Sequence, residues 1–355
     1  MITARKWVAA SFGGPEVLRE IEVDVPDPGR GYVTIDVRSC GMNPADAKHI
    51  APGQDPKLLP LSLGFEVAGV VTELGPDTEL GSGGGTVGDE IVAQVSGGYA
   101  TVITTSASSV FAKPSPLSFP EAANLLLAGT TGADLLHTSG AQEGETVLLH
   151  GAAGAVGVSV LQQARLIGVR VVGTASPANF DFVRRFGAIP VEYGPGLLER
   201  VRTVAPEGVA AALDTVGSDE AGDVSLALVA DRRRVVTIAA APRAKADGYV
   251  FIGASNPASG PFRARARSRI LKLAQDGDLL VPMAQTFPFA DAPAALAALT
   301  GPHPPGKLAL VRPRALVAPR RRSRQGLGFL GQQRGDGDLG LGGGGQQGRQ
   351  AGDGG

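Results

Sequence analysis

The residues best suited to chemistry form the run Gly151-Ala152-Ala153-Gly154-Ala155-Val156-Gly157, which directly follows the apolar segment 146–150. A strand that turns tightly into a helix aims backbone N–H groups and the positive end of the helix dipole at one point, where a pyrophosphate can bind. Gly154 would let a phosphate approach the backbone, and Gly157 would let the helix lie close to the sheet. An ordinary tight turn is the alternative, because Ala152 replaces the first glycine of the usual G-x-G-x-x-G pattern. We expect a dinucleotide to contact Gly151, Ala152, Gly154, Ala155, Val156 and Gly157.

The residues after the second expected strand favour NADPH over NADH. Enzymes that use NAD carry Asp or Glu about 20 residues after such a turn, where the acid binds the ribose 2′-hydroxyl. Here residues 173–177 read Gly-Thr-Ala-Ser-Pro, and the next acid is Asp181. A carboxylate would repel a 2′-phosphate, whereas the Ser176 hydroxyl suits it. Arg184 and Arg185 lie nearby, with simple exposure to solvent as their alternative role.

The elements that must position this turn change in character along the chain. Residues 1–120 alternate short aliphatic runs with Gly and Pro, which predicts a compact, barrel-like β domain with strands near 32–38, 67–74, 90–95 and 99–104. The first of these strands alternates polar and apolar residues, which is typical of a half-buried strand. Ser118 and Glu121 then form a helix-start signal, and the pattern predicts a helix over 121–139.

Strands and helices alternate from residue 146. We expect strands at 146–150, 169–174, 209–214, 235–239 and 249–252, and helices at 155–167, 178–186, 197–203 and 220–229. The strands are apolar on both faces, which predicts a doubly wound parallel sheet in an α/β fold. A helix at 262–275, strands at 281–287 and 307–311 and a helix at 290–299 should return to the first domain.

Composition narrows the class of protein. The formal net charge is −1, which gives no indication of nucleic acid or an anionic membrane as a partner. Cys40 is the only cysteine, so no disulfide within the chain and no multi-cysteine zinc site can form, and the cytoplasm is the expected compartment. No apolar run is long enough to span a bilayer. Residues 314–355 are rich in Gly, Gln and Arg and are predicted to be a disordered tail; a basic contact patch at 320–324 and an aberrant reading-frame end are alternatives.

Ordered motifs extend the prediction to a family. They are Gly13–Leu18 (GGPEVL), Asn43–Asp46 (NPAD), Gly64–Val71 (GFEVAGVV), Val87–Val92 (VGDEIV), Gly97–Ala100 (GGYA), the glycine turn, Asp214–Gly217 (DTVG) and Gly306–Leu310 (GKLAL). Over about residues 3–313 the chain resembles the medium-chain dehydrogenase/reductase superfamily, in its zinc-free NADPH:quinone oxidoreductase (zeta-crystallin-like) branch. The resemblance implies a GroES-like catalytic domain (1–120 and 262–313) and a Rossmann NADP-binding domain (121–261). It also implies a homodimer joined at sheet edges, for which 249–252 is a candidate.

The resemblance makes a catalytic zinc unexpected. Metal-dependent relatives place a Cys where this chain has Asn43, a His where it has Phe65 and a Cys near Leu127, and none of these three side chains is a competent zinc ligand. His49 and Cys40 remain nearby, but each is expected to pack or to face solvent. Without a Lewis acid, the expected substrate is already electron-poor at carbon.

The family's roles carry over to matching positions. Asn43 should lie beside the nicotinamide and the substrate, and Glu66 should be a buried structural carboxylate. Lys48 and His49 occupy the neighbourhood of a tyrosine found in relatives, so Lys48 is a candidate proton donor, with solvent as the alternative. The expected cofactor contacts are Thr131 at the nicotinamide end, Gly154, Ala155 and Val156 at the pyrophosphate, Ser176 and Tyr193 at the 2′-phosphate, Asp214 and Val216 at the nicotinamide ribose, Phe251 and Ile252 near the nicotinamide, and Lys307 beside the cofactor. Tyr193 as a surface aromatic and Asp214 as a strand-end cap are the alternatives.

Three functions remain open. The first is an NADPH-dependent oxidoreductase that transfers hydride to a quinone without zinc. The second is an NADPH-dependent reductase of enones or 2-enoyl thioesters, and the third is a non-catalytic NADPH-binding structural protein. The pattern leaves the substrate, the proton donor and the oligomeric state open.

Overall fold

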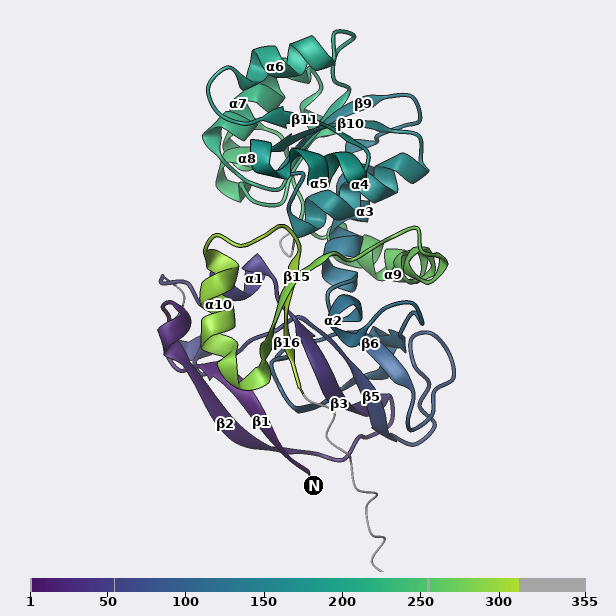
Figure 1. The fold of residues 1–355 in the computed structure, drawn as a ribbon. Coiled ribbons are helices and arrows are strands. Elements are labelled where there is room, and N and C mark those ends of the chain that lie inside the picture. Colours follow the sequence, from purple (N-terminus) through teal and green to yellow (C-terminus); the bar gives the residue numbers. More distant parts are fainter. Residues whose placement is uncertain (1, 54, 254–255, 313–355) are drawn as a thin grey trace, which may run out of the picture. The chain divides into compact units, whose positions relative to one another are not determined.

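The computed structural model describes residues 2–53, 55–253 and 256–312. The predicted tail at 314–355 lies outside the described residues. The described residues form one lobe built mainly of antiparallel strands and one built on a parallel sheet (Figure 1). No helix in these ranges combines the length and the apolar character needed to cross a bilayer.

The β-rich lobe combines the start of the chain with its last strands. Its strands are β1 (Ile2–Ala9), β2 (Leu18–Val25), β3 (Tyr32–Gly41), β4 (Leu61–Ser62), β5 (Glu66–Leu74), β6 (Glu90–Gln94), β7 (Val102–Ser106), β8 (Val110–Ala112), β15 (Met283–Pro288) and β16 (Lys307–Val311). They form a sheet of order β15-β16-β3-β5-β6-β8, in which β7 also pairs with β3, and a smaller sheet of order β2-β1-β4. Its helices are α1 (Pro44–His49), α2 (Phe119–Ala122) and α10 (Ala292–Thr300).

The pairing of β16 with β3 joins the end of the chain to its beginning. Ala309 lies opposite Gly41 and Val311 opposite Ser39 in an antiparallel ladder, and β15 extends the same sheet. In Figure 1 the yellow-green strands accordingly lie among the purple and blue ones. Strands β15 and β16 thus extend the sheet that contains β3, and the division at residues 120 and 262 stays a proposal.

Strand β3 corrects one expectation. Its polar–apolar alternation predicted a half-buried strand, but Thr34 and Asp36 are buried along with Val33, Ile35 and Val37. The Thr34 hydroxyl meets that of Thr104 at 2.8 Å, and Asp36 accepts a hydrogen bond from Arg312 at 2.8 Å. Buried polar groups are tolerated when they have such partners, so alternation here marks internal hydrogen bonding and not exposure to solvent.

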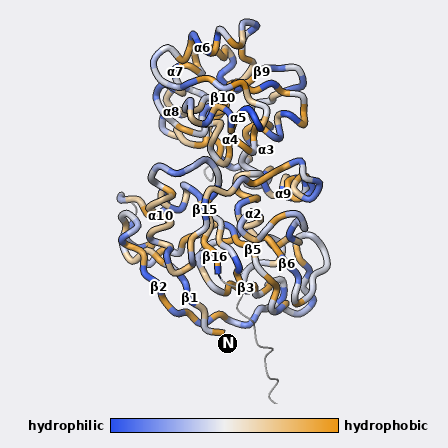
Figure 2. The backbone as a smooth tube through the Cα atoms, in the orientation of Figure 1, coloured by the Kyte–Doolittle hydropathy of each residue, from blue (hydrophilic) through white to orange (hydrophobic). Residues whose placement is uncertain are grey.

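The second lobe is a six-stranded parallel sheet of order β11-β10-β9-β12-β13-β14. The strands are β9 (Thr146–His150), β10 (Arg170–Ala175), β11 (Ala188–Glu192), β12 (Ala211–Asp214), β13 (Val235–Thr237) and β14 (Val250–Phe251), and the helices are α3 (Leu126–Ser139), α4 (Ala155–Leu166), α5 (Phe180–Arg185), α6 (Leu197–Val204), α7 (Asp219–Leu228) and α8 (Ala241–Asp247). Helix α9 (Ser259–Asp276) shares a hydrophobic cluster with Phe111 of the β-rich lobe and Leu126 of α3, so it contacts both lobes. Separate hydrophobic clusters contain Leu149 and Leu148, neighbours in β9 that point to opposite faces of the sheet. Hydrophobic residues recur along the strands in Figure 2. The predicted doubly wound α/β fold is confirmed.

Two elements of this lobe were not predicted. Strand β11 contains Pro190, which lowers the strand signal, but β11 is the outermost strand and an edge tolerates a residue without an N–H donor. Helix α8 is short and begins with Ala241-Pro242, so it lacks the apolar periodicity of the longer helices.

The expected single helix over 121–139 is two helices, which is a second correction. The capping box predicted at Ser118 and Glu121 starts α2, but α2 ends at Ala122 and a tighter turn separates it from the start of α3 at Leu126. The backbone N–H of Asn124 donates to Glu121, three residues back, while its side chain takes the carbonyl of Pro120 at 2.9 Å. The side chain thus replaces the backbone bond that would have continued the helix.

Candidate active site

The glycine turn joins β9 to α4, as predicted. Gly151 has φ +80°, and a Cβ at this position would lie 2.5 Å from the Thr215 hydroxyl oxygen. The backbone N–H groups of Gly151 and Ala152 bind the Thr174 hydroxyl and carbonyl, at 3.1 and 3.0 Å. Both the backbone angle and the lack of space therefore require glycine at 151.

The start of α4 leaves room and hydrogen-bond donors for an anion. Gly154 is the N-cap of this 12-residue helix, and no side chain caps it in the described part of the chain. A Cβ on Gly154 would meet only the Gly151 carbonyl oxygen, at 3.3 Å, whereas one on Gly157 would lie 2.3 Å from the same oxygen. Gly157 thus lets α4 pack on the carbonyls of its own turn, and the N–H groups of Ala155 and Val156 lie in the first turn of α4, where helix N–H groups have no partner within the helix and can bind an anion.

Ser176 and Tyr193 lie side by side just after the carboxyl ends of the neighbouring strands β10 and β11. Ala175 pairs with Glu192 in the parallel ladder of β10 and β11, and Ser176 and Tyr193 are the next residues of each strand. Tyr193 is exposed, and Ser176 is partly exposed at the start of a short 3-10 helix. Asp181 is exposed and bound to Arg184 at 2.8 Å, so this arginine is engaged on its own helix.

Asp214 shapes the turn after β12. One carboxylate oxygen accepts the N–H groups of Val216 and Gly217 at 2.8 and 2.9 Å, and the other accepts the Thr237 hydroxyl at 2.7 Å. The Thr215 hydroxyl donates to the carbonyl of His150, the last residue of β9, at 2.8 Å. These bonds give Asp214 the strand-end capping role and leave the Val216 side chain exposed beside Gly151.

Four further predicted residues lie outside the turn itself. Phe251 ends β14 at the opposite edge of the sheet, and the Ile252 side chain belongs to a hydrophobic core cluster. Thr131 is buried within α3. Lys48 is exposed on α1, and the His49 ring meets the edge of Phe65 at a centroid distance of 5.6 Å.

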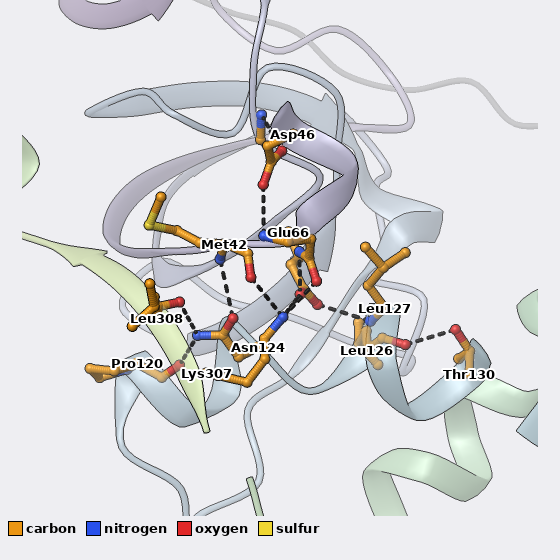
Figure 3. A network of polar contacts seen from close by, with 12 residues as sticks. Met42, Asp46, Glu66, Pro120, Asn124, Leu126, Leu127, Thr130, Lys307 and Leu308 are labelled. Atoms are coloured by element: carbon orange, nitrogen blue, oxygen red, sulfur yellow. Dashed lines mark hydrogen bonds and ion pairs between the residues drawn. The ribbon is translucent and has the colours of Figure 1, made fainter. Parts of the chain in front are cut away.

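A buried polar cluster joins Asn43, Glu66 and Lys307, three residues from distant parts of the sequence. The Lys307 ammonium donates to the Met42 carbonyl at 2.8 Å and to Asn43 Oδ1 at 2.5 Å. Asn43 Nδ2 donates to Glu66 Oε1 at 2.9 Å, and Glu66 Oε2 accepts the Leu127 N–H at 2.9 Å. All three side chains are at least 95% buried. Figure 3 shows Lys307 and Glu66 converging from β16 and β5.

Asn124 completes this cluster and was missed by the sequence analysis. Its side chain accepts the Met42 N–H at 3.2 Å and donates to the carbonyls of Pro120 and Leu308 at 2.9 and 3.1 Å (Figure 3). It therefore fixes the backbone on both sides of the cluster. The available signal was a lone amide in the otherwise apolar run Ala122-Ala123-Asn124-Leu125, since a buried polar side chain must find partners.

Burial shifts two ionisable groups here. The pKa of Lys307 is lowered because burial disfavours its charge, and this is opposed by the nearby Glu66, whose Oε1 lies 3.7 Å from the ammonium. Burial also raises the pKa of Asp46 to about 6. The Asp46 carboxylate accepts the N–H groups of Asn43 and Gly64 and the Tyr99 hydroxyl, at 2.8, 3.2 and 3.0 Å, so it anchors the start of α1 behind Asn43.

One cavity of about 290 Å³ brings the glycine turn and the polar cluster together. It is lined by Ala153, Gly154 and Ala155 of the turn, by Met42 and Pro44 on either side of Asn43, and by residues 303–308, which include Lys307. Residues predicted to bind the pyrophosphate and Lys307, predicted to lie beside the cofactor, thus line the same cavity. Among the described residues, no three His, Cys, Asp or Glu side chains are grouped closely enough to hold a metal ion.

Comparison with known families agrees with this arrangement. Residues 29–115 match the alcohol dehydrogenase GroES-like domain, and residues 190–310 match the family described as zinc-binding dehydrogenase. The quinone oxidoreductase of Sus scrofa is 36% identical over 182 residues, which are 49% of this chain and 55% of that protein. This chain therefore spans about half the length of the curated quinone oxidoreductases that it matches.

Two longer matches extend over most of the chain. The spectinabilin polyketide synthase system protein NorB of Streptomyces orinoci is 32% identical over 332 residues, which are 88% of this chain and 15% of that protein. A mycobacterial protein solved with NADPH is 29% identical, with a TM-score of 0.76, and the match covers 87% of this chain and all of that one. The fold, the glycine turn and these matches together show that the chain belongs to the medium-chain dehydrogenase/reductase superfamily.

Proposed function

We propose that this protein is an NADPH-dependent oxidoreductase that transfers hydride to a quinone without zinc. The observation that carries the proposal is the cavity shared by residues 153–155 of the glycine turn and Lys307 of the polar cluster. A nicotinamide cofactor bound there would supply the hydride. The chain's part is to bind the phosphates through the α4 N-terminus, to orient the substrate beside Asn43 and to exclude water.

We propose NADPH rather than NADH because Ser176 stands where NAD enzymes carry an acid, and because a similar mycobacterial protein was solved with NADPH. Calorimetry should give NADPH a dissociation constant at least about tenfold lower than that of NADH, because a 2′-phosphate gains charge-assisted hydrogen bonds. The variant Ser176→Glu should reverse the preference by repelling the phosphate. Tighter NADH binding by the unaltered protein would contradict the assignment.

Zinc independence rests on Asn43, Phe65 and Leu127, which occupy the ligand positions of metal-dependent relatives. Metal analysis of the purified protein should find far less than one zinc per chain, and a chelator should leave turnover unchanged. A stoichiometric zinc that is lost together with activity would reject the proposal.

The substrate class is tested by following NADPH oxidation with a panel of quinones and a panel of enones. A quinone reductase should be accelerated most by the quinones. If no compound in either panel accelerates oxidation, the protein is better described as a non-catalytic NADPH-binding structural protein.

Reduction of enoyl thioesters is the second candidate. It is favoured by the match to NorB, a polyketide synthase system protein, because that match spans 88% of this chain whereas the quinone oxidoreductase match spans 49%. A crotonyl thioester that is turned over with a higher kcat/KM than any quinone would favour this candidate.

We also propose a homodimer formed through β14, one of the two edge strands of the parallel sheet, because an edge strand offers hydrogen-bonding groups to a second copy. Light scattering should report twice the chain mass. The variant Phe251→Pro removes the N–H that faces away from β13 and should yield monomers. A monomeric unaltered protein would contradict the proposal.

A further inference from the structure

The side-chain amide of Asn43 has one allowed orientation. Its oxygen accepts from the Lys307 ammonium at 2.5 Å, and its nitrogen donates to the Glu66 carboxylate at 2.9 Å. Turning the amide over would place its N–H₂ group against an ammonium and its oxygen against a carboxylate. Both contacts would be repulsive in a site shielded from water, so the two ions decide which atom of the amide lies where.

Backbone contacts hold the two ions themselves in place. Lys307 also donates to the Met42 carbonyl, and Glu66 also accepts the Leu127 N–H. The Asn43 backbone N–H binds Asp46, which fixes the main chain from which the amide projects. The amide is therefore held from both ends on three separate elements, β16, β5 and the start of α1.

This arrangement leaves one hydrogen-bond donor unused. An amide nitrogen carries two protons, and within residues 2–53, 55–253 and 256–312 Glu66 is the only acceptor bound to Asn43 Nδ2. Two of the three Lys307 protons are used on Met42 and Asn43, and the third is near Glu66 at 3.7 Å. The amide nitrogen is consequently a better free donor than the lysine.

We propose that Lys307 and Glu66 are positioning residues that hold Asn43 so that its second Nδ2 proton binds the carbonyl oxygen of the substrate. This inference rests on the proposed function. As hydride adds to a ring or alkene carbon, the π electrons move to that oxygen, and the N–H group stabilises the negative charge without giving up its proton. A proton from solvent then completes the product. The opposite charges of Lys307 and Glu66 offset each other, so the site suits a neutral carbonyl compound rather than a carboxylate.

Spectroscopy tests the clamp without turnover. The chain has four asparagines, Asn43, Asn124, Asn179 and Asn256, so protein labelled with ¹⁵N-asparagine gives a simple spectrum in which Asn43→Ser identifies the Asn43 side-chain pair. That pair should shift in Lys307→Met and in Glu66→Gln. It should stay in place in the matched control Lys113→Met, because the buried Lys113 ammonium binds Leu117 and not this cluster. An unchanged Asn43 signal in Lys307→Met would overturn the clamp.

Addition of duroquinone without cofactor tests the donor. One of the two Asn43 side-chain protons should move downfield while the other, bound to Glu66, stays. If neither proton moves at duroquinone concentrations that shift neighbouring backbone signals, the donor role is wrong. A protein that shows these shifts but reduces neither quinones nor enones would refute the proposed function and leave this inference standing.

Kinetics supplies the last test. Asn43→Ala should lower kcat about 100-fold, the usual effect of losing one charge-stabilising donor. Lys307→Met should lower kcat about 10-fold or more. Both variants should change the KM for NADPH little. Lys307→Arg should recover part of the activity and keep it at higher pH, because a guanidinium stays charged where lysine does not. A pH profile that is identical in the lysine and arginine forms would contradict the positioning role.

Discussion

At the scale of single residues, the protonation of the buried Asp46 carboxyl makes the stability of the fold depend on pH. Its carboxyl is buried with a pKa of about 6, above the ordinary value of 3.8. A group whose pKa is raised in the folded state binds its proton more tightly there than in the unfolded chain. The Asp46 contribution to stability is therefore greatest below about pH 4 and falls as pH rises to about 6.

Asp46→Asn should accordingly flatten the stability profile between about pH 4 and 6, where the shift accounts for up to about 3 kcal/mol. Tyr99→Phe should move this window to higher pH, because the Tyr99 hydroxyl stabilises the charged carboxylate. Urea unfolding at a series of pH values measures both effects. A difference between Asp46→Asn and the unaltered protein that is constant across this range would exclude Asp46 as the titrating group.

Gly151 gives a second prediction at this scale. Gly151→Ala should destabilise the fold and weaken NADPH binding, because its φ of +80° strains any side chain and the new Cβ would meet Thr215. Gly144→Ala is a matched control, since φ is +82° there but no atom lies within 4 Å of the added Cβ. The control should lose about 1 kcal/mol from backbone strain alone, and Gly151→Ala clearly more. Equal losses in thermal unfolding would show that the contact with Thr215 is unimportant.

At the scale of elements, Asn124 decides where α2 ends and ties it to β16 and to the start of α1. Asn124→Ala removes the donor to the Pro120 carbonyl, while the Met42 N–H and the Leu308 carbonyl keep the hydrogen bond that joins them at 3.2 Å. Leaving one partly buried carbonyl unsatisfied costs about 1–3 kcal/mol, so the free energy of unfolding should fall by about that amount. Asn179→Ala, at a partly exposed position, is the control and should change stability little. A loss below about 1 kcal/mol for Asn124→Ala would mean that water replaces these bonds.

At the scale of the whole molecule, cofactor binding should stabilise the fold, because a ligand that binds only the folded state shifts the unfolding equilibrium. At a concentration of 100 dissociation constants the gain is about 2.7 kcal/mol. Melting curves should therefore shift upward with NADPH and, at equal concentration, less with NADH. No shift with NADPH at saturating concentration would contradict the assignment of the glycine turn.

Local features of the sequence determined the fold class and the glycine turn. The turn lies in seven consecutive residues between two regular elements, so its geometry follows from short-range sterics. The parallel strands were predicted from continuous apolar runs, because both faces of such a sheet are buried. Boundaries were less accurate where a tertiary contact overrides the pattern, as at the break after α2 and in the buried polar positions of β3.

Only the tertiary structure decided how the site is assembled. Lys307 and Asn43 are 264 residues apart and meet because β16 pairs with β3, a register that no local pattern encodes. The resemblance had singled out both residues, but not their contact, the bond to Glu66 or the part played by Asn124. Hydrogen bonds between distant segments depend on which strands become neighbours in the fold. Burial excludes water from these contacts, which strengthens each hydrogen bond and makes an unpaired polar group costly.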